Sequence, residues 1–229
     1  GEAAAPAGTV TVDITKADGT AVITAGATTG TTSAPRVYTL AAASNSVLQL
    51  FTAVWKDGAT ERLRTLVETV GGFYYSLAEL EAFDADLGDI TDAGTVQARA
   101  RRVRIEVEHE CERITGVAWV PRYRRERLSG TGTSKLVLSE WYPRTVRSVR
   151  VYTTAPDYTA FDSDELAAID LLAHGVLCRT GGAVWPNGAG NITVEYEHGR
   201  DTPPGDLRHA TMTRFRSLWN RENSGIPDR

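Results

Sequence analysis

Alternating apolar and polar residues dominate the first third of the chain and predict β-strands there. In TVTVDI at 9–14 every second residue is apolar, and Asp18-Gly19 then supplies the tight turn that leads into AVITA. Three more strand-like runs follow: RVYTL at 36–40, VLQLFTAVW at 47–55 and ERLRTLVETVG at 61–71. This pattern predicts a small antiparallel β-sandwich over 9–72, immunoglobulin-like in outline. We expect residues 1–8 to form a flexible arm.

Helical periodicity replaces the alternation after Phe73. Ser76 and Glu79 have the spacing of a capping box and predict a helix over 76–87. The strongest helix of the chain is predicted over 94–115. Its apolar residues recur at steps of three and four, which places them along one side; they are Val96, Ala100, Val103, Val107, Cys111 and Ile114.

The charges of the 94–115 helix are segregated along its length. The first half carries Arg99, Arg101, Arg102 and Arg104, and the second half carries Glu106, Glu108, Glu110 and Glu112. This order opposes the helix dipole, at a cost of roughly a few tenths of a kcal/mol for each misplaced end charge. Two interpretations stay open: a solvated amphipathic face, or a helix whose two ends contact neighbouring copies in a ring.

Strand-like segments return in the second half and predict a β-rich insertion over about 135–199. KLVLSEWYP and TVRSVRVYTT flank a break at Pro143, and NITVEYEHG at 191–199 has one apolar face. The segment 165–180 is ambiguous, because it fits either a helix that ends at His174 or two strands joined by a His174-Gly175 turn. The basic run PRYRRER at 121–127 fits a solvated loop, a protein interface or a DNA contact.

The C-terminal segment predicts a helix over 204–222 and a flexible tail over 223–229. Pro203-Pro204 suits a first helical turn, and Asp206 places a negative charge near the positive end of the helix dipole. Most of the helix's apolar residues share one side, and the tail SGIPDR is too short and polar to fold alone. A strand, a basic helix and a loose tail resemble a docking device more than a catalytic pocket.

Composition changes this picture mainly through charge. The 229 residues carry a net charge of −4, but residues 1–92 are acidic on balance and the remainder is basic, and arginine outnumbers lysine 22 to 3. An arginine-rich second half suits protein interfaces or reflects a GC-rich genome. It does not match the strongly basic face of a dedicated nucleic-acid binder. No apolar run approaches the length of a membrane span, and no signal peptide is visible.

No enzyme, metal or cofactor site emerges from the sequence. The four histidines lie in different predicted elements without metal-ligand spacing, and the aspartates between 84 and 92 lack the spacing of a calcium loop. Cys111 lies on an apolar helix face, and Cys178 has no evident activating base. We therefore expect a protein that is not an enzyme, with no catalytic, metal or cofactor-binding residues.

The order of parts from Leu77 to Trp219 resembles the head-to-tail adaptor proteins of long-tailed bacteriophages. Three pieces carry the resemblance: EVEHECERITG with the following VAWVPRYRRERLSG, then LVLSEWYPRTVRSVRV, and last NITVEYEHGRDTPPGDLRHATMTRF. The resemblance implies an α+β chain in which a helical adaptor core over 73–229 carries the β-rich insertion and a C-terminal docking helix. It also implies that 165–180 forms a β-hairpin. The domain at 9–72 departs from the short members of this family.

The resemblance further implies a structural role in the virion, with assembly in the host cytoplasm. The adaptor would form a ring, usually of twelve copies, beneath the portal protein, contact a downstream connector, stopper or tail protein, and surround the DNA passage. Genomic DNA in the bore is then a non-specific contact, and no membrane is involved. On this hypothesis Arg208, Phe215, Trp219 and Ile226 dock on the portal, while the segregated charges of 99–112 form the subunit interface.

A second hypothesis comes from another functional class. An immunoglobulin-like module followed by a β-rich binding domain also suits a secreted or surface adhesion protein. The long charged helix, the basic helix after Pro203-Pro204 and the lack of a visible signal peptide count against it.

Overall fold

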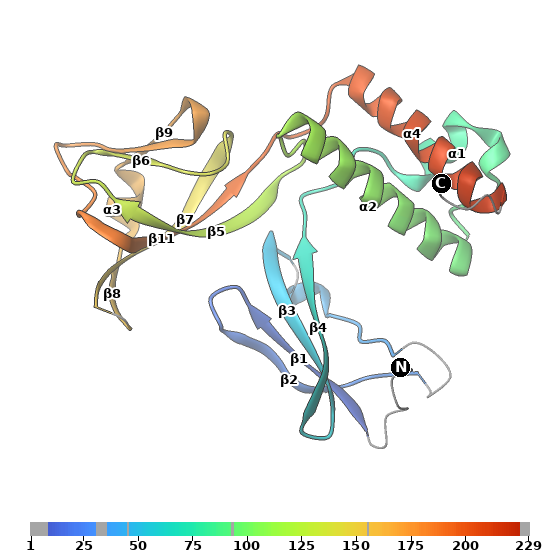
Figure 1. The fold of residues 1–229 in the computed structure, drawn as a ribbon, viewed down its shortest axis with the longest axis horizontal. Coiled ribbons are helices and arrows are strands. Elements are labelled where there is room, and N and C mark those ends of the chain that lie inside the picture. Colours follow the sequence, from blue (N-terminus) through green and yellow to red (C-terminus); the bar gives the residue numbers. More distant parts are fainter. Residues whose placement is uncertain (1–8, 31–35, 45, 93, 155, 225–229) are drawn as a thin grey trace.

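The chain folds into three units that meet at one junction (Figure 1). A computed structural model describes residues 9–30, 36–44, 46–92, 94–154 and 156–224. An N-terminal sheet, a helical unit and a β-rich insertion each have a hydrophobic core of their own. The expected α+β class with antiparallel sheets is confirmed.

The N-terminal unit is one antiparallel sheet of four strands in the order β2-β1-β3-β4. Its strands are β1 (Val10–Lys16), β2 (Ala21–Ala27), β3 (Gln49–Asp57) and β4 (Thr60–Thr69), and the short 3-10 helix η1 (Ala42–Ser44) lies in the connection before β3. In the described residues there is no second sheet, so the predicted sandwich is wrong. The predicted strand at 36–40 instead places Tyr38 and Leu40 against the core of Val12, Ile14, Phe51 and Ala53. An extended cover over a sheet shows the same alternation as a strand, which explains the error.

The helical unit contains α1 (Leu77–Phe83), η2 (Ala85–Leu87), α2 (Thr95–Thr115) and α4 (Gly205–Ser224). Ser76 and Glu79 form the expected capping box. The helix predicted over 76–87 breaks at Asp84, because this residue ends α1 and its side chain caps η2. On α2, the central residues of the predicted apolar stripe are buried, whereas Val96 and Ile114 at its ends are exposed. The helix α4 extends beyond the expected end at 222.

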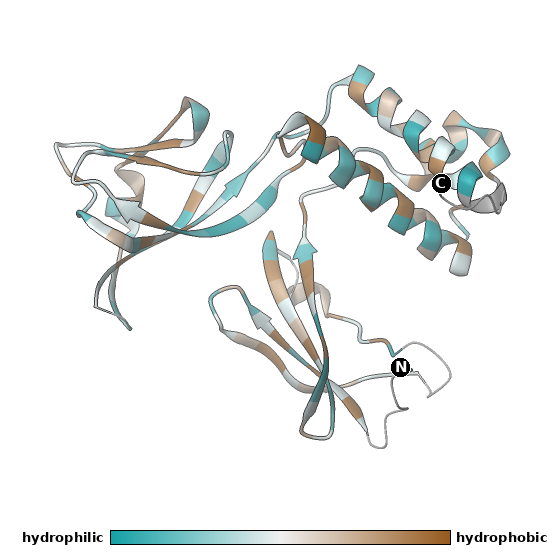
Figure 2. Ribbon diagram, in the orientation of Figure 1, coloured by the Kyte–Doolittle hydropathy of each residue, from teal (hydrophilic) through white to brown (hydrophobic). Residues whose placement is uncertain are grey.

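The β-rich insertion consists of two small antiparallel sheets around a shared core that includes Trp185. The first has the order β5-β11-β7-β8, with β5 (Arg122–Gly130), β7 (Pro143–Thr154), β8 (Asp157–Ala160) and β11 (Gly188–His198). The second has the order β6-β10-β9, with β6 (Lys135–Val137), β9 (Ile169–Leu172) and β10 (Val176–Arg179). Strand β5 begins at Arg122, ahead of the expected start at 135. It is mostly hydrophilic (Figure 2), so its sequence lacks the apolar alternation of a typical strand.

The ambiguous segment 165–180 forms a hairpin after the one-turn helix α3 (Ser163–Ala167). Strands β9 and β10 pair antiparallel, and the 3-10 turn η3 (Ala173–Gly175) joins them. His174 and Gly175 adopt φ angles of 63° and 73°, in the left-handed region. A Cβ on Gly175 would lie 2.3 Å from the carbonyl oxygen of Glu140, so only glycine fits there. The β-hairpin prediction for this segment is therefore confirmed.

The packing of α4 against α2 depends on Phe215, which is 0% exposed. We expect Phe215→Ala to lower the free energy of unfolding by about 3–5 kcal/mol, because it removes a buried ring and leaves a cavity. Chemical denaturation followed by circular dichroism measures the change. The matched control Ile114→Ala removes an exposed side chain of α2 and should change stability by less than about 0.5 kcal/mol. Equal effects of the two substitutions would contradict this assignment.

Candidate docking and assembly surfaces

The structure places the four residues predicted to dock on the portal in different settings. Phe215 is buried and Trp219 is 4% exposed, and their rings stack with centroids 5.8 Å apart in the core of the helical unit. Arg208 is half-buried at the other end of α4, where its Nε donates to the Tyr74 carbonyl and its guanidinium pairs with Glu79. Ile226 lies outside the described residues. Phe215 and Trp219 therefore stabilise the chain's own fold and do not form an exposed docking surface.

The charged residues of α2 that the sequence placed in two halves differ in their exposure to solvent. Arg101, Arg102 and Glu106 are exposed, whereas Arg104 and Glu108 are buried. The other three are half-buried: Arg99 lies 4.4 Å from the centroid of the Trp219 ring, Glu110 pairs with Arg214 of α4 and Glu112 pairs with Arg122 of β5. Most of the acidic half of α2 is thus engaged within the chain.

Arg104 and Glu108 hold the segment that enters α1. The Tyr74 N–H donates to Glu108 over 2.9 Å, and Arg104 donates to the Tyr75 carbonyl over 3.2 Å. The Arg104 guanidinium also lies 3.5 Å from the centroid of the Phe73 ring. Burial raises the pKa of Glu108 to about 7, although the Tyr74 N–H and Arg104 oppose that shift. Through these contacts the two side chains fix the chain entry to α1, and they are unavailable to a neighbouring subunit.

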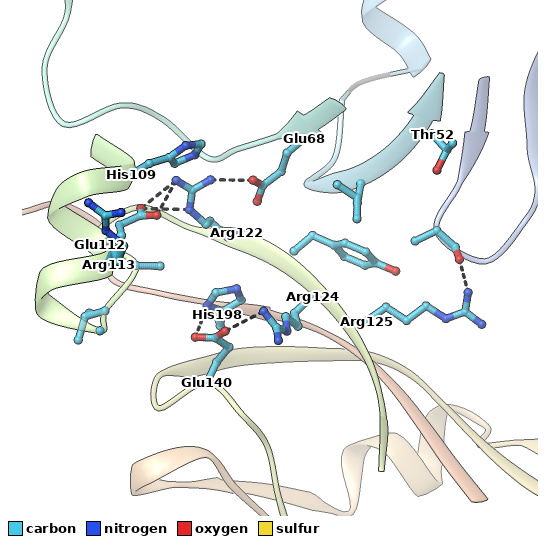
Figure 3. A pocket seen from close by; sticks show the side chains of 16 residues that line it. Thr52, Glu68, His109, Glu112, Arg113, Arg122, Arg124, Arg125, Glu140 and His198 are labelled. Carbon is cyan, nitrogen blue, oxygen red and sulfur yellow. Dashed lines mark hydrogen bonds and ion pairs between the residues drawn. The ribbon is translucent and has the colours of Figure 1, made fainter. Parts of the chain in front are cut away.

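Arg122 joins all three units at a single point (Figure 3). It lies on β5, and its guanidinium contacts Glu112 of α2 and Glu68 of β4, each with an N···O distance of 2.8 Å. Burial opposes the charge on Arg122, but Glu112 and Glu68 raise its pKa nonetheless. For the carboxyl of Glu68 burial acts in the other direction and raises the pKa, and Arg122 offsets part of that rise. The network therefore fixes the N-terminal sheet, α2 and the insertion relative to one another.

A cavity of about 820 Å³ lies beside this network (Figure 3). Strands β3 and β4, the end of α2 and the start of β5 line it, and its charged residues have both signs. His198 at its wall is buried with Nδ1 3.6 Å from Glu140, and burial, Arg124 and Arg122 lower its pKa to about 4. The imidazole is thus neutral at neutral pH. Arginine and glutamate neutralise one another across most of the cavity, which gives it no dominant charge for a single kind of ligand.

The basic run at 121–127 forms the first part of β5, and each of its four arginines has a partner within the chain. Arg122 is described above, Arg124 pairs with Glu140, and Arg125 pairs with Glu195 and donates to the Ala17 carbonyl. Arg127 donates to the Gly190 carbonyl and lies over the Tyr152 ring. The run is thus a strand whose arginines contact this same chain, and not the solvated loop of the first interpretation; contact with another protein or with DNA stays a prediction. The basic run is evident in the sequence, but its partners Glu68 and Glu112 could not be predicted from it.

Within the described ranges, no group of three or more His, Cys, Asp or Glu residues is placed to hold a metal ion. None of the helices in this part of the chain has both the length and the apolar character that a membrane crossing needs.

The buried carboxyl of Glu108 should make the stability of the fold depend on pH. Its pKa is raised above the usual value of 4.5, so its contribution to stability is fully present below pH 4.5 and is lost as the pH rises through about 7. Glu108→Gln imitates the protonated carboxyl at every pH. We expect the wild-type chain to gain stability relative to Glu108→Gln between pH 8 and pH 4.5, as measured by urea unfolding of both proteins at each pH. A difference that stays constant, or changes in the opposite direction, would contradict the assignment.

Comparison with known proteins gives a likeness of fold. No family model matches the chain, and no curated protein matches it. Among solved structures, the chain is similar to one from the neck of an empty GTA (gene transfer agent) particle, computed with C6 symmetry. The TM-score is 0.50 at 17% sequence identity, and the similarity covers 68% of this chain and 83% of that chain. This chain therefore shares its fold with a neck component of a phage-like particle.

Proposed function

We propose that the chain is a structural virion protein of the head-to-tail neck, and within that class the adaptor. In this role it forms a ring under the portal, links the capsid vertex to the next tail connector and surrounds the DNA passage. The observation that carries the proposal is the fold likeness to a neck chain, which extends over most of both chains. The neck that contains that chain was computed with C6 symmetry, which supports a ring.

The three-unit shape suits such a role, because a ring subunit needs two different complementary surfaces. The insertion and the N-terminal sheet extend from the helical unit in different directions (Figure 1). Several large apolar side chains are exposed, including Trp141 of the insertion and Ile114 of α2. Separate protruding units allow contacts with a neighbouring copy, the portal and a downstream protein at the same time.

The surface of α2 that can form a subunit contact is smaller than the sequence suggested. Arg101 and Arg102 remain exposed, but Glu108 is buried and Glu110 and Glu112 pair within the chain. The acidic complement on a neighbouring copy must then come mainly from elsewhere. The turn between α1 and α2 offers it, since the side chains of Asp86, Asp89 and Asp92 are exposed. We assign the ring contact to this pair of surfaces.

The adhesion-protein alternative has less support than the adaptor. It rested on an immunoglobulin-like sandwich, and the N-terminal unit is a single four-stranded sheet. The proposed portal contact also changes, because Phe215 and Trp219 are buried. Arg208 is the one described member of the proposed docking set that is not buried, and Ile226 remains a candidate outside the described residues.

Portal binding is the direct test of the proposed function. Purified protein is mixed with the portal ring of the same particle and examined by negative-stain electron microscopy. We expect an extra annulus at one end of the portal. A variant without residues 225–229 loses Ile226 but keeps the core residue Trp219, so it should fold normally and give fewer annuli. Bare portals beside a folded, full-length chain would contradict the adaptor assignment.

Charge reversal on α2 tests the ring contact separately. Arg101→Glu combined with Arg102→Glu should keep the fold, because both side chains lie on the exposed side of α2. We expect at least a tenfold loss of ring assembly on the portal, measured by counting decorated portals at equal protein concentration. The control Arg113→Glu changes an exposed charge at the other end of the same helix and should assemble like the wild type. Normal assembly of the double variant would support the solvated-face interpretation.

A further inference from the structure

Among the described residues, no strand pairs with the outer edge of β4 in the N-terminal sheet. Strand β4 is the last strand in the order β2-β1-β3-β4, ten residues long and without proline. Its side chains are unusually apolar for an exposed edge, with Leu63 54%, Leu66 69% and Val67 48% exposed. A long edge strand of this kind presents unpaired N–H and C=O groups and can pair with another strand.

The opposite edge of the sheet is protected from such pairing. Strand β2 pairs with β1 through two irregularities in register, and Ala25 within β2 has a φ of 50°. The Ala25 N–H donates to the Asp13 side chain over 2.7 Å. Bulges and irregular backbone are common ways of preventing edge pairing. Strand β4 has one such irregularity, near the hairpin, and is regularly paired with β3 from Leu63 to Thr69.

The sequence of β4 is complementary to itself in one antiparallel register, and we propose that two copies of this chain pair through it. With Thr65 opposite Thr65 of the second copy, Leu63 comes opposite Val67 twice. These residues lie on the same side of the sheet as the buried Phe51 and Ala53, because Val67 pairs with Phe51 and Thr65 with Ala53. Pairing therefore extends the apolar face of one sheet across the two-fold axis into the other.

The charged residues of β4 fit the same register. Arg64 comes opposite Leu66 of the second copy, so its aliphatic stem can cover that exposed side chain. Arg62 comes opposite Glu68; it is the residue that the irregularity leaves without a partner on β3, and it already pairs with Asp57 over 3.1 Å. Glu68 already pairs with Arg122, but a carboxylate has acceptor sites for a second guanidinium. Charges on an edge strand usually discourage pairing. In this register, however, Arg62 of one copy faces Glu68 of the other, and these opposite charges favour a second copy as the partner.

The interface is small and the dimer should be correspondingly weak. A single strand pair with four apolar side chains at its centre lies below the size of stable interfaces, which bury about 1,200–2,000 Å². Dimer formation is therefore expected at high protein concentration. This pairing is independent of the proposed function, since it needs neither the portal nor the charges of α2.

Cysteine cross-linking tests both the pairing and its register. Residues directly opposite in an antiparallel pair have Cα atoms about 4.5–5.5 Å apart, which a disulfide can span. Thr65→Cys, in the full chain with Cys178→Ser to remove the partly exposed native thiol, should form a covalent dimer under mild oxidation. Leu63→Cys alone and Val67→Cys alone should not, because each lies about 13 Å from its own copy. An equimolar mixture of these two variants should cross-link.

Sedimentation velocity provides a second measurement without cysteines. The wild-type chain should show a monomer–dimer equilibrium, and Leu63→Lys should weaken it at least tenfold, since a lysine would face Val67 of the second copy. The matched control Ile114→Lys changes an exposed apolar residue of α2 and should leave the equilibrium unchanged. A chain that stays monomeric up to about millimolar concentration would overturn the proposal. So would cross-linking of similar yield at positions 63, 65 and 67.

Discussion

The arrangement of the three units depends on the pairing of one buried arginine. Arg122 lies at the start of β5, where the chain leaves the helical unit, and it contacts Glu112 of α2 and Glu68 of β4. Burial opposes the charge of its guanidinium, and the two carboxylates that offset this effect come from two different units. Any change in the relative position of the N-terminal sheet, α2 and the insertion would break one of these pairs. The network therefore links three units whose apolar cores are separate.

The uneven charge of the sequence has a structural explanation in the same region. Arginines of the insertion contact the N-terminal sheet at three further places: Arg125 donates to the Ala17 carbonyl, Arg147 donates to the Leu48 carbonyl, and Arg150 lies 3.6 Å from Asp18. Two acidic residues of the N-terminal unit, Asp18 and Glu68, thus have arginine partners in the insertion. Arginine suits this role, because its planar group can donate to a carbonyl and a carboxylate together, as Arg147 does with Leu48 and Glu197. Part of the arginine content that suggested external interfaces is therefore used in contacts within the chain.

Sequence patterns predicted the elements more reliably than their packing. Local signals, such as the capping box at Ser76 and the apolar periodicity of α2, placed the helices within a few residues. Signals that depend on distant partners failed. The extended segment at 36–40 could not be distinguished from a strand, and Phe215 and Trp219 could not be recognised as core without knowledge of α2. Arg104 and Glu108 were taken for surface charges, because nothing local reveals that the backbone of Tyr74 and Tyr75 is their partner.

The two proposed contacts between copies differ in symmetry, and the symmetry of each contact determines which kind of assembly it can form. The α2 contact joins unlike surfaces, so it is heterologous and can close a ring, whereas β4 pairing joins like surfaces about a two-fold axis. Neighbours related by a simple ring rotation cannot be joined through a two-fold contact unless part of each chain departs from that rotation. The Arg122 network opposes such a departure, because Glu68 of β4 takes part in it. The β4 contact therefore cannot be the one that joins neighbours within a ring, and the two contacts serve different assemblies.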